Sequence, residues 1–223
     1  MKARESTIVP DTHLIVGDIQ DRKFLGELPP DLVGKWDKIF SNATLHWCSR
    51  DPLAVLISVH HLLKEGGLFV AEMGGCGNIA GMNSSLYIHE AMVVEHRFYV
   101  QGVRDALHTA LRKRGNDPVA RDPWFYPTPD QYMRLLRSAN LVPLQVSLHP
   151  RVTPFADLDG WIRLFGRQFL EEIESEDKPE LVNEVVGSCR ESGACHWDEE
   201  KQLWYLDYVR LRIIAMKARD HDD

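Results

Sequence analysis

The chain has 223 residues, of which 44% are hydrophobic, and its mean hydropathy is -0.28. This length suits one domain with a single sizeable core rather than two. The net charge of -7 and the pI of about 5.8 exclude the basic surface of a nucleic-acid-binding protein and argue against binding to an anionic membrane. We therefore expect a small-molecule or protein partner.

The cysteines and the N-terminus point to a cytoplasmic protein. Cys48, Cys76, Cys189 and Cys195 form no CxxC pair and join no histidine cluster at zinc-ligand spacing, so we expect no metal site and reduced thiols. The first residues contain no apolar signal segment, and no uncharged apolar run reaches the roughly 18 residues that a membrane-spanning helix needs.

The first third of the chain alternates strands with a helix. Residues 12–17 and 36–42 are predicted strands. Asp51 and Pro52 are predicted to begin a helix that runs to about residue 64, and residues 68–72 form a continuous apolar strand. Strand, helix and strand in this order predict an α/β fold with a mostly parallel sheet.

The rest of the chain is predicted to be mainly helical, with two later strands. Thr128 and Pro129 are the predicted cap and first residue of one helix, and Pro143 places the strand that follows at a sheet edge. In order, we expect a long helical stretch at 79–114, an aromatic and proline-rich loop at 115–127, a helix at 128–139, a strand at 141–148, two helices within 157–188 and a strand at 203–215.

Two segments that follow predicted strands are candidates for ligand binding. They are GDIQD at residues 17–21 and FSNATLHW at residues 40–47. Ligands of open parallel sheets bind beyond the carboxyl ends of the strands, so we expect both segments to face one crevice.

Five segments in order resemble class I S-adenosylmethionine (SAM) dependent methyltransferases of the type 11 superfamily, in the trans-aconitate methyltransferase-like group. The segments are GDIQD, WDKIFSNATLHW, DPLAVLISVHHLLKEGGLFVAEMGG, PWFYPTPDQYMRLL and DLDGWIRLF. The likeness runs from about residue 16 to residue 218. It implies a Rossmann-like methyltransferase fold in one domain, residues 1–223, with its sheet core at 12–78 and 141–218 and a helical lid and acceptor region inserted at 79–140.

The resemblance implies four residues that hold SAM. Asp18 matches the acid that accepts a hydrogen bond from the adenine amino group, and Ile19 packs beside the adenine. Asn42 and Ala43 match the strand end that faces the methionine part of SAM. From the residues alone, a cap of the turn after Gly17 is the favoured explanation of Asp18.

The resemblance also places the methyl-acceptor pocket. It begins at His46 and Trp47, where His46 acts as a general base or orients a carboxylate or hydroxyl group. The alternative is a hydrogen-bonded core histidine beside a packing tryptophan. The other residues expected to line the pocket are Gly75, Asn78, Trp124, Tyr126 and Trp161, for which a turn or ordinary core packing remains an alternative.

The glycine-rich stretch at residues 74–81 is not a dinucleotide-binding loop. Its spacing from Gly75 is GxGxxxG, and no strand-end acid follows about 20 residues later.

Nothing before Asp18 resembles the first two strands of this fold or its glycine-rich SAM loop, so the fold is expected to be incomplete and SAM to bind weakly or not at all. An exposed apolar strand edge would then favour a homodimer or a partner subunit. We expect a SAM-dependent methyltransferase-like protein that acts on a small organic acid or a secondary metabolite. The alternatives are a SAM-independent cyclase, isomerase or dehydratase on the same fold, or a non-catalytic subunit.

Overall fold

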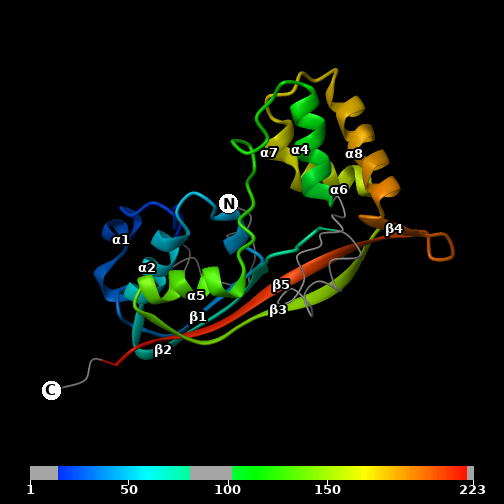
Figure 1. Cartoon of the computed structure of the whole chain (residues 1–223). Coiled ribbons are helices and arrows are strands. Elements are labelled where there is room, and N and C mark those ends of the chain that lie inside the picture. Colours follow the sequence, from blue (N-terminus) through cyan, green and yellow to red (C-terminus); the bar gives the residue numbers. More distant parts are fainter. Residues whose placement is uncertain (1–14, 81–101, 220–223) are drawn as a thin grey trace, which may run out of the picture.

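A mixed five-stranded sheet organises the chain in the computed structural model, which describes residues 15–80 and 102–219 (Figure 1). The strand order is β1-β2-β5-β3, and β4 also pairs with β5. β1 and β2 are parallel, whereas β2, β3 and β4 each pair with β5 in the antiparallel sense. Four strands therefore run in one direction and β5 in the other, which confirms the expected α/β fold with mostly parallel strands.

The unit from β1 to β2 follows the predicted order. β1 (Trp36–Asn42) is followed by the short helix η4 (Leu45–Trp47), by α2 (Pro52–Leu62) and by β2 (Leu63–Gly74). The Asp51 carboxylate accepts a hydrogen bond from the Ala54 N–H, at 2.9 Å, and so caps α2 as predicted. The helix ends two residues earlier than expected because Leu63 is already extended.

The predicted helix cap and edge strand are confirmed in the next unit. Thr128 and Gln131 form a capping box at the start of α5 (Pro129–Ser138). β3 (Leu141–Phe155) lies at one end of the strand order and shifts register between Pro143 and Gln145, as expected where proline cannot donate to the ladder. It continues past residue 148 because it pairs with β5 (Leu203–Lys217) as far as Trp204.

A separate helical layer covers one end of the sheet (Figure 1). It consists of α4 (Val103–Lys113), α6 (Leu158–Phe165), α7 (Arg167–Leu170) and α8 (Lys178–Ser192). These helices share one hydrophobic cluster, which includes Phe169 and Leu206. The expected pair of helices within 157–188 is thus three helices, and β4 (Cys195–Asp198) was not predicted because it has only four residues.

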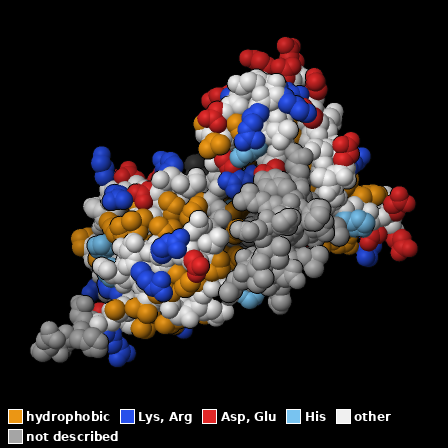
Figure 2. Space-filling view, in the orientation of Figure 1, with side chains coloured by type: hydrophobic (Ala, Val, Ile, Leu, Met, Phe, Trp, Pro, Cys, Tyr) orange, Lys and Arg blue, Asp and Glu red, His pale blue; other side chains and the backbone are white. Residues whose placement is uncertain are grey.

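A second hydrophobic cluster lies between the sheet and the helices α2 and α5. The other face of this half of the sheet carries a groove of about 410 Å³, lined by residues that include Phe40, Val70 and Ile214. The side chain of Phe40 is 72% exposed. Figure 2 shows hydrophobic side chains at the surface of the sheet half, whereas acidic side chains gather at the tip of the helical layer.

Two expectations fall wholly or partly outside the described residues. Residues 12–14 of the first expected strand lie outside them, and the described residues 15–17 are not in a strand. They lead into α1 (Phe24–Glu27) and η3 (Pro30–Leu32). Within the helical stretch expected at 79–114, residues 81–101 are likewise not described. In the described ranges no helix is long and apolar enough to cross a membrane.

Candidate functional site

His46 occupies a buried position at the carboxyl end of β1. It lies in η4, and 7% of its surface is exposed. Its Nδ1 atom accepts a hydrogen bond of 3.3 Å from the backbone N–H of Gly74, at the end of β2. Its carbonyl oxygen accepts a hydrogen bond of 2.8 Å from the N–H of Phe125. His46 therefore connects the ends of two parallel strands to the loop that precedes α5.

The surroundings of His46 keep its imidazole uncharged. Burial lowers the pKa of His46, and the positive charge of Arg210 lowers it further, to about 4. A neutral imidazole has one donor and one acceptor nitrogen. Because Nδ1 accepts from Gly74, we assign the proton to Nε2, which makes Nε2 a hydrogen-bond donor.

Aromatic side chains from three segments form a continuous wall beside His46. The His46 ring lies 5.4 Å from Trp47 and 5.9 Å from Tyr126, measured between ring centroids. Trp124 contacts Trp47 at 6.1 Å, stacks on Tyr126 at 6.0 Å and meets Trp161 at 6.5 Å. We call Trp47, Trp124, Tyr126 and Trp161 the aromatic wall.

The turn after β2 packs closely against this wall. The Asn78 side chain is hydrogen-bonded to Tyr126, and its Oδ1 atom accepts from the N–H of Val209 at 3.0 Å. A Cβ atom at Gly74 would lie 2.4 Å from Cε1 of Tyr126, and one at Gly75 would lie 2.5 Å from a methyl group of Leu148. Both glycines therefore permit close approach of the backbone. The turn is well packed rather than loose.

The structure adds two arginines that the sequence did not single out. The guanidinium carbon of Arg210 lies 4.5 Å from the centroid of the Tyr208 ring, and that of Arg104 lies 5.6 Å from the centroid of Tyr126. The Tyr208 hydroxyl accepts a hydrogen bond of 2.8 Å from Nε1 of Trp161. Nothing in the spacing of these residues marks them, because Tyr208 and Arg210 lie within a strand and Arg104 within a helix.

The four residues expected to hold SAM lie in two places. The carboxylate of Asp18 is half-exposed, accepts a hydrogen bond of 3.0 Å from the N–H of Gln20 and pairs with Arg50. The Gln20 N–H, and then Arg50, lower the pKa of Asp18. The turn-capping geometry is therefore present. Ile19 is partly buried and packs against the cluster below α2 and α5.

Asn42 and Ala43 lie at the end of β1. Asn42 is exposed and lines the groove on the open face of the sheet. Ala43 has a positive φ of 54°, and its N–H donates to the carbonyl oxygen of Glu72 at 2.8 Å. A small side chain suits this backbone conformation better than a branched one.

The fit of SAM to these residues can be tested on Asp18. A carboxylate has about four acceptor positions, and Gln20 and Arg50 occupy two of them. Because the side chain is 49% exposed, an amino group can still reach it. The residues present are therefore compatible with the adenine of SAM.

Most of the residues expected to bind the methyl acceptor thus lie together in the structure. The residues expected to bind SAM lie apart from them. His46, Gly75, Asn78 and the aromatic wall form one contiguous group through the contacts given above. Among the described residues, no hydrogen bond, ion pair or ring contact joins Asp18 or Ile19 to that group.

Comparison with known proteins supports a methyltransferase-like protein. The chain is 28% identical over 195 residues to an uncharacterized methyltransferase of Schizosaccharomyces pombe, an alignment that covers 86% of this chain. The chain spans 65% of the length of that relative. A search against protein-family models found no match.

Two solved structures overlap with the chain at low similarity. One is a protein from Bacillus halodurans named only provisionally as a methyltransferase, with 13% identity, a TM-score of 0.47 and coverage of 91% of this chain and 76% of the other. The second is the YcgJ protein from Bacillus subtilis, with 14% identity, a TM-score of 0.45 and coverage of 86% and 68%. Overlaps at this level support no inference about the chain. The relative from Schizosaccharomyces pombe is the reason to describe the chain as methyltransferase-like.

Proposed function

We propose that the chain is a SAM-dependent methyltransferase-like protein that acts on a small organic acid or a secondary metabolite. The observation that carries this proposal is the group formed by His46 and the aromatic wall at the carboxyl ends of β1 and β2. In open α/β sheets this end of the strands is where ligands bind.

Arg210 supports an acidic acceptor. It is half-buried, and among the described residues it forms no ion pair with a carboxylate. Its guanidinium group is partly exposed and can bind a carboxylate in a bidentate manner, so a carboxylate group of the acceptor suits this position. The aromatic wall suits the unsaturated or apolar body of the same molecule.

His46 orients the acceptor rather than removing its proton. Its neutral imidazole carries the proton on Nε2, so that atom donates a hydrogen bond to an oxygen of the acceptor. A carboxylate is already ionised at neutral pH and needs no general base. Positioning of the attacking oxygen is then the main contribution of the protein.

Asp18, Ile19, Asn42 and Ala43 would hold the cofactor in this proposal. SAM supplies an electrophilic methyl group when bound. Asp18 would accept a hydrogen bond from the adenine amino group, Ile19 would pack beside the base, and the small Ala43 would allow the methionine part to approach the end of β1.

Transfer of radiolabelled methyl groups from SAM to a panel of small carboxylic acids tests the proposal. We expect labelled methyl ester with at least one acid, and a strong loss of label with His46→Asn. His61→Asn is the matched control, because His61 is exposed at the end of α2 and its ring bonds to the carbonyl oxygen of Ile57 in the same helix. Turnover of an acid without SAM would favour a SAM-independent enzyme, and no turnover with any acid would favour a non-catalytic subunit. Either result would contradict the proposal.

A further inference from the structure

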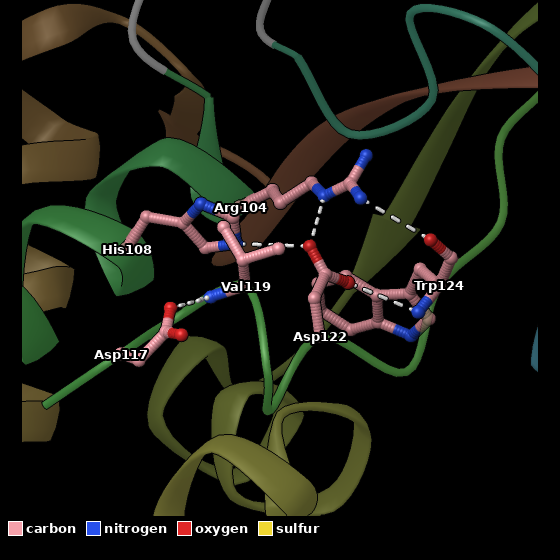
Figure 3. A network of polar contacts seen from close by, with 6 residues as sticks. All are labelled: Arg104, His108, Asp117, Val119, Asp122 and Trp124. Carbon is pink, nitrogen blue, oxygen red and sulfur yellow. Dashed lines mark hydrogen bonds and ion pairs between the residues drawn. The ribbon is translucent and has the colours of Figure 1, made fainter. Parts of the chain in front are cut away.

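The loop between α4 and α5 is held by a buried carboxylate that belongs to neither expected ligand site. Asp122 lies in this loop, and 6% of its side chain is exposed. One oxygen, Oδ2, accepts hydrogen bonds from Arg104 Nε at 2.5 Å and from His108 Nε2 at 2.9 Å. Figure 3 shows both donors extending from α4 toward this single oxygen.

The second oxygen of Asp122 connects the network to the aromatic wall. Oδ1 accepts a hydrogen bond of 3.0 Å from the backbone N–H of Trp124. Arg104 also donates from its terminal nitrogen to the carbonyl oxygen of Trp124 at 3.2 Å (Figure 3). Both backbone groups of Trp124 are thus fixed by the same ion pair.

Through its ring contacts, the position of Trp124 also affects the other side chains of the aromatic wall. Trp124 stacks on Tyr126 and contacts Trp47 and Trp161, so a shift of the Trp124 backbone changes all three contacts. The guanidinium of Arg104 also lies against Tyr126. Phe169, on α7, packs edge-on against Trp124, with 5.2 Å between the two ring centroids.

The charge on Asp122 is well supported. Burial by itself would raise the pKa of Asp122, but the hydrogen bonds from His108, from the Trp124 N–H and from Arg104 outweigh burial and lower it. Breaking one partner of a buried ion pair costs more than the pair contributes, because the other charge is left without compensation. Loss of the carboxylate charge therefore leaves Arg104, on α4, without its charged partner.

We propose that Asp122, acting through Arg104 and the backbone of Trp124, is the positioning residue that sets the aromatic wall beside His46 and thereby controls acceptor binding. The role in acceptor binding rests on the proposed function. The role of Asp122 in fixing the aromatic wall is independent of the proposed function, because it concerns only the contacts of Trp124.

The test compares Asp122→Asn with a control from the same loop. Asp117 also accepts a hydrogen bond from a backbone N–H, that of Val119 at 2.9 Å, and no interaction drawn in Figure 3 joins it to Trp124. Trp124→Phe identifies the part of the near-ultraviolet circular dichroism that arises from Trp124. Far-ultraviolet circular dichroism and cooperative melting show whether each variant is folded.

For Asp122→Asn we expect loss of the near-ultraviolet component assigned to Trp124 and amide exchange of the segment around Trp124 that is faster by about tenfold or more. Asp117→Asn is expected to retain both signals. Wild-type circular dichroism and exchange in folded Asp122→Asn would overturn the proposal. If Asp122→Asn does not fold, Arg104→Lys decides, because it keeps the charge but loses the fork that reaches Trp124. Wild-type signals in that variant would equally overturn it.

A kinetic measurement connects the network to the acceptor. Once an acceptor is identified, Asp122→Asn should raise its KM by about tenfold and lower kcat by less than about threefold, since the wall contributes binding rather than chemistry. An unchanged KM would refute the role in acceptor binding. If no acceptor is ever methylated, the proposed function fails, and the spectroscopic test of the positioning role still stands.

Discussion

At the scale of single residues, burial determines the charge state of His46. A histidine on the surface would be partly charged near pH 6.5, but burial and Arg210 hold the pKa of His46 at about 4. The ring therefore stays neutral over the usual physiological range. A pKa this far below neutral pH makes the imidazole a weak base, which favours the orienting role over the general base, a choice that the sequence left open.

The pH dependence of stability tests this assignment. The folded pKa of His46 lies below its value in the unfolded chain, so protonation favours unfolding. The stability that depends on neutral His46 is fully present above about pH 6.5 and is lost as the pH falls toward 4. Between about pH 7 and about pH 4.5 we expect the wild type to lose about 2 kcal/mol more unfolding free energy than His46→Asn, measured by urea denaturation. Equal losses in the two proteins would show that His46 is not desolvated.

The residues grouped around His46 could be named from the sequence, but the side chains that hold them in place could not. His46, Asn78, Trp124 and Tyr126 fall in segments with recognisable motifs. Arg104, Asp122 and Arg210 act only through contacts between distant segments: 18 positions separate Arg104 from Asp122, and Asn78 bonds to a residue 131 positions away. Contacts between residues this far apart in the sequence produce no periodic pattern from which they could be predicted.

At the scale of elements, local signals predicted the structure well wherever a backbone rule applies. Asp51 with Pro52, and Thr128 with Pro129, marked two helix starts correctly. Lengths were predicted less well, because they depend on tertiary pairing: β3 continues to Phe155 along β5, and the helices within 157–188 divide at Gly166.

The capping box of α5 gives an element-scale prediction. Thr128 Oγ1 accepts a hydrogen bond from the Gln131 N–H at 3.2 Å, and the Gln131 side chain accepts one from the Thr128 N–H at 2.9 Å. We expect Thr128→Ala to lower the free energy of unfolding by about 1 kcal/mol, since it leaves a helix N–H without its partner. Thr128→Ser keeps the hydroxyl group and should stay within about 0.5 kcal/mol of the wild type. A cost as large for serine as for alanine would contradict the role of the cap.

At the scale of the whole molecule, the sheet has one covered and one open face in its β1 half. Among the described strands β1 pairs only with β2, so its other edge is unpaired. The exposed Phe40 lies on this strand beside the groove of about 410 Å³. Unpaired strand edges with apolar side chains favour association.

We therefore propose that the chain forms a homodimer through the β1 edge. Light scattering with size exclusion should give twice the monomer mass of 25.6 kDa at micromolar concentration. Phe40→Lys should shift the protein toward the monomer. Val119→Lys, at a position that is 68% exposed in the loop before α5, is the control and should leave the dimer intact. A monomeric wild type would refute this proposal.

The central proposal is that this α/β chain binds SAM through Asp18 and its neighbours, and saturation-transfer NMR tests it most directly. The method detects weak binding, which matters because the sequence predicts that SAM binds weakly or not at all. With millimolar SAM we expect saturation of the adenine protons in the wild type, and loss of that signal in Asp18→Ala. Asp117→Asn should retain it. No transfer to SAM, or transfer that Asp18→Ala leaves unchanged, would contradict the account.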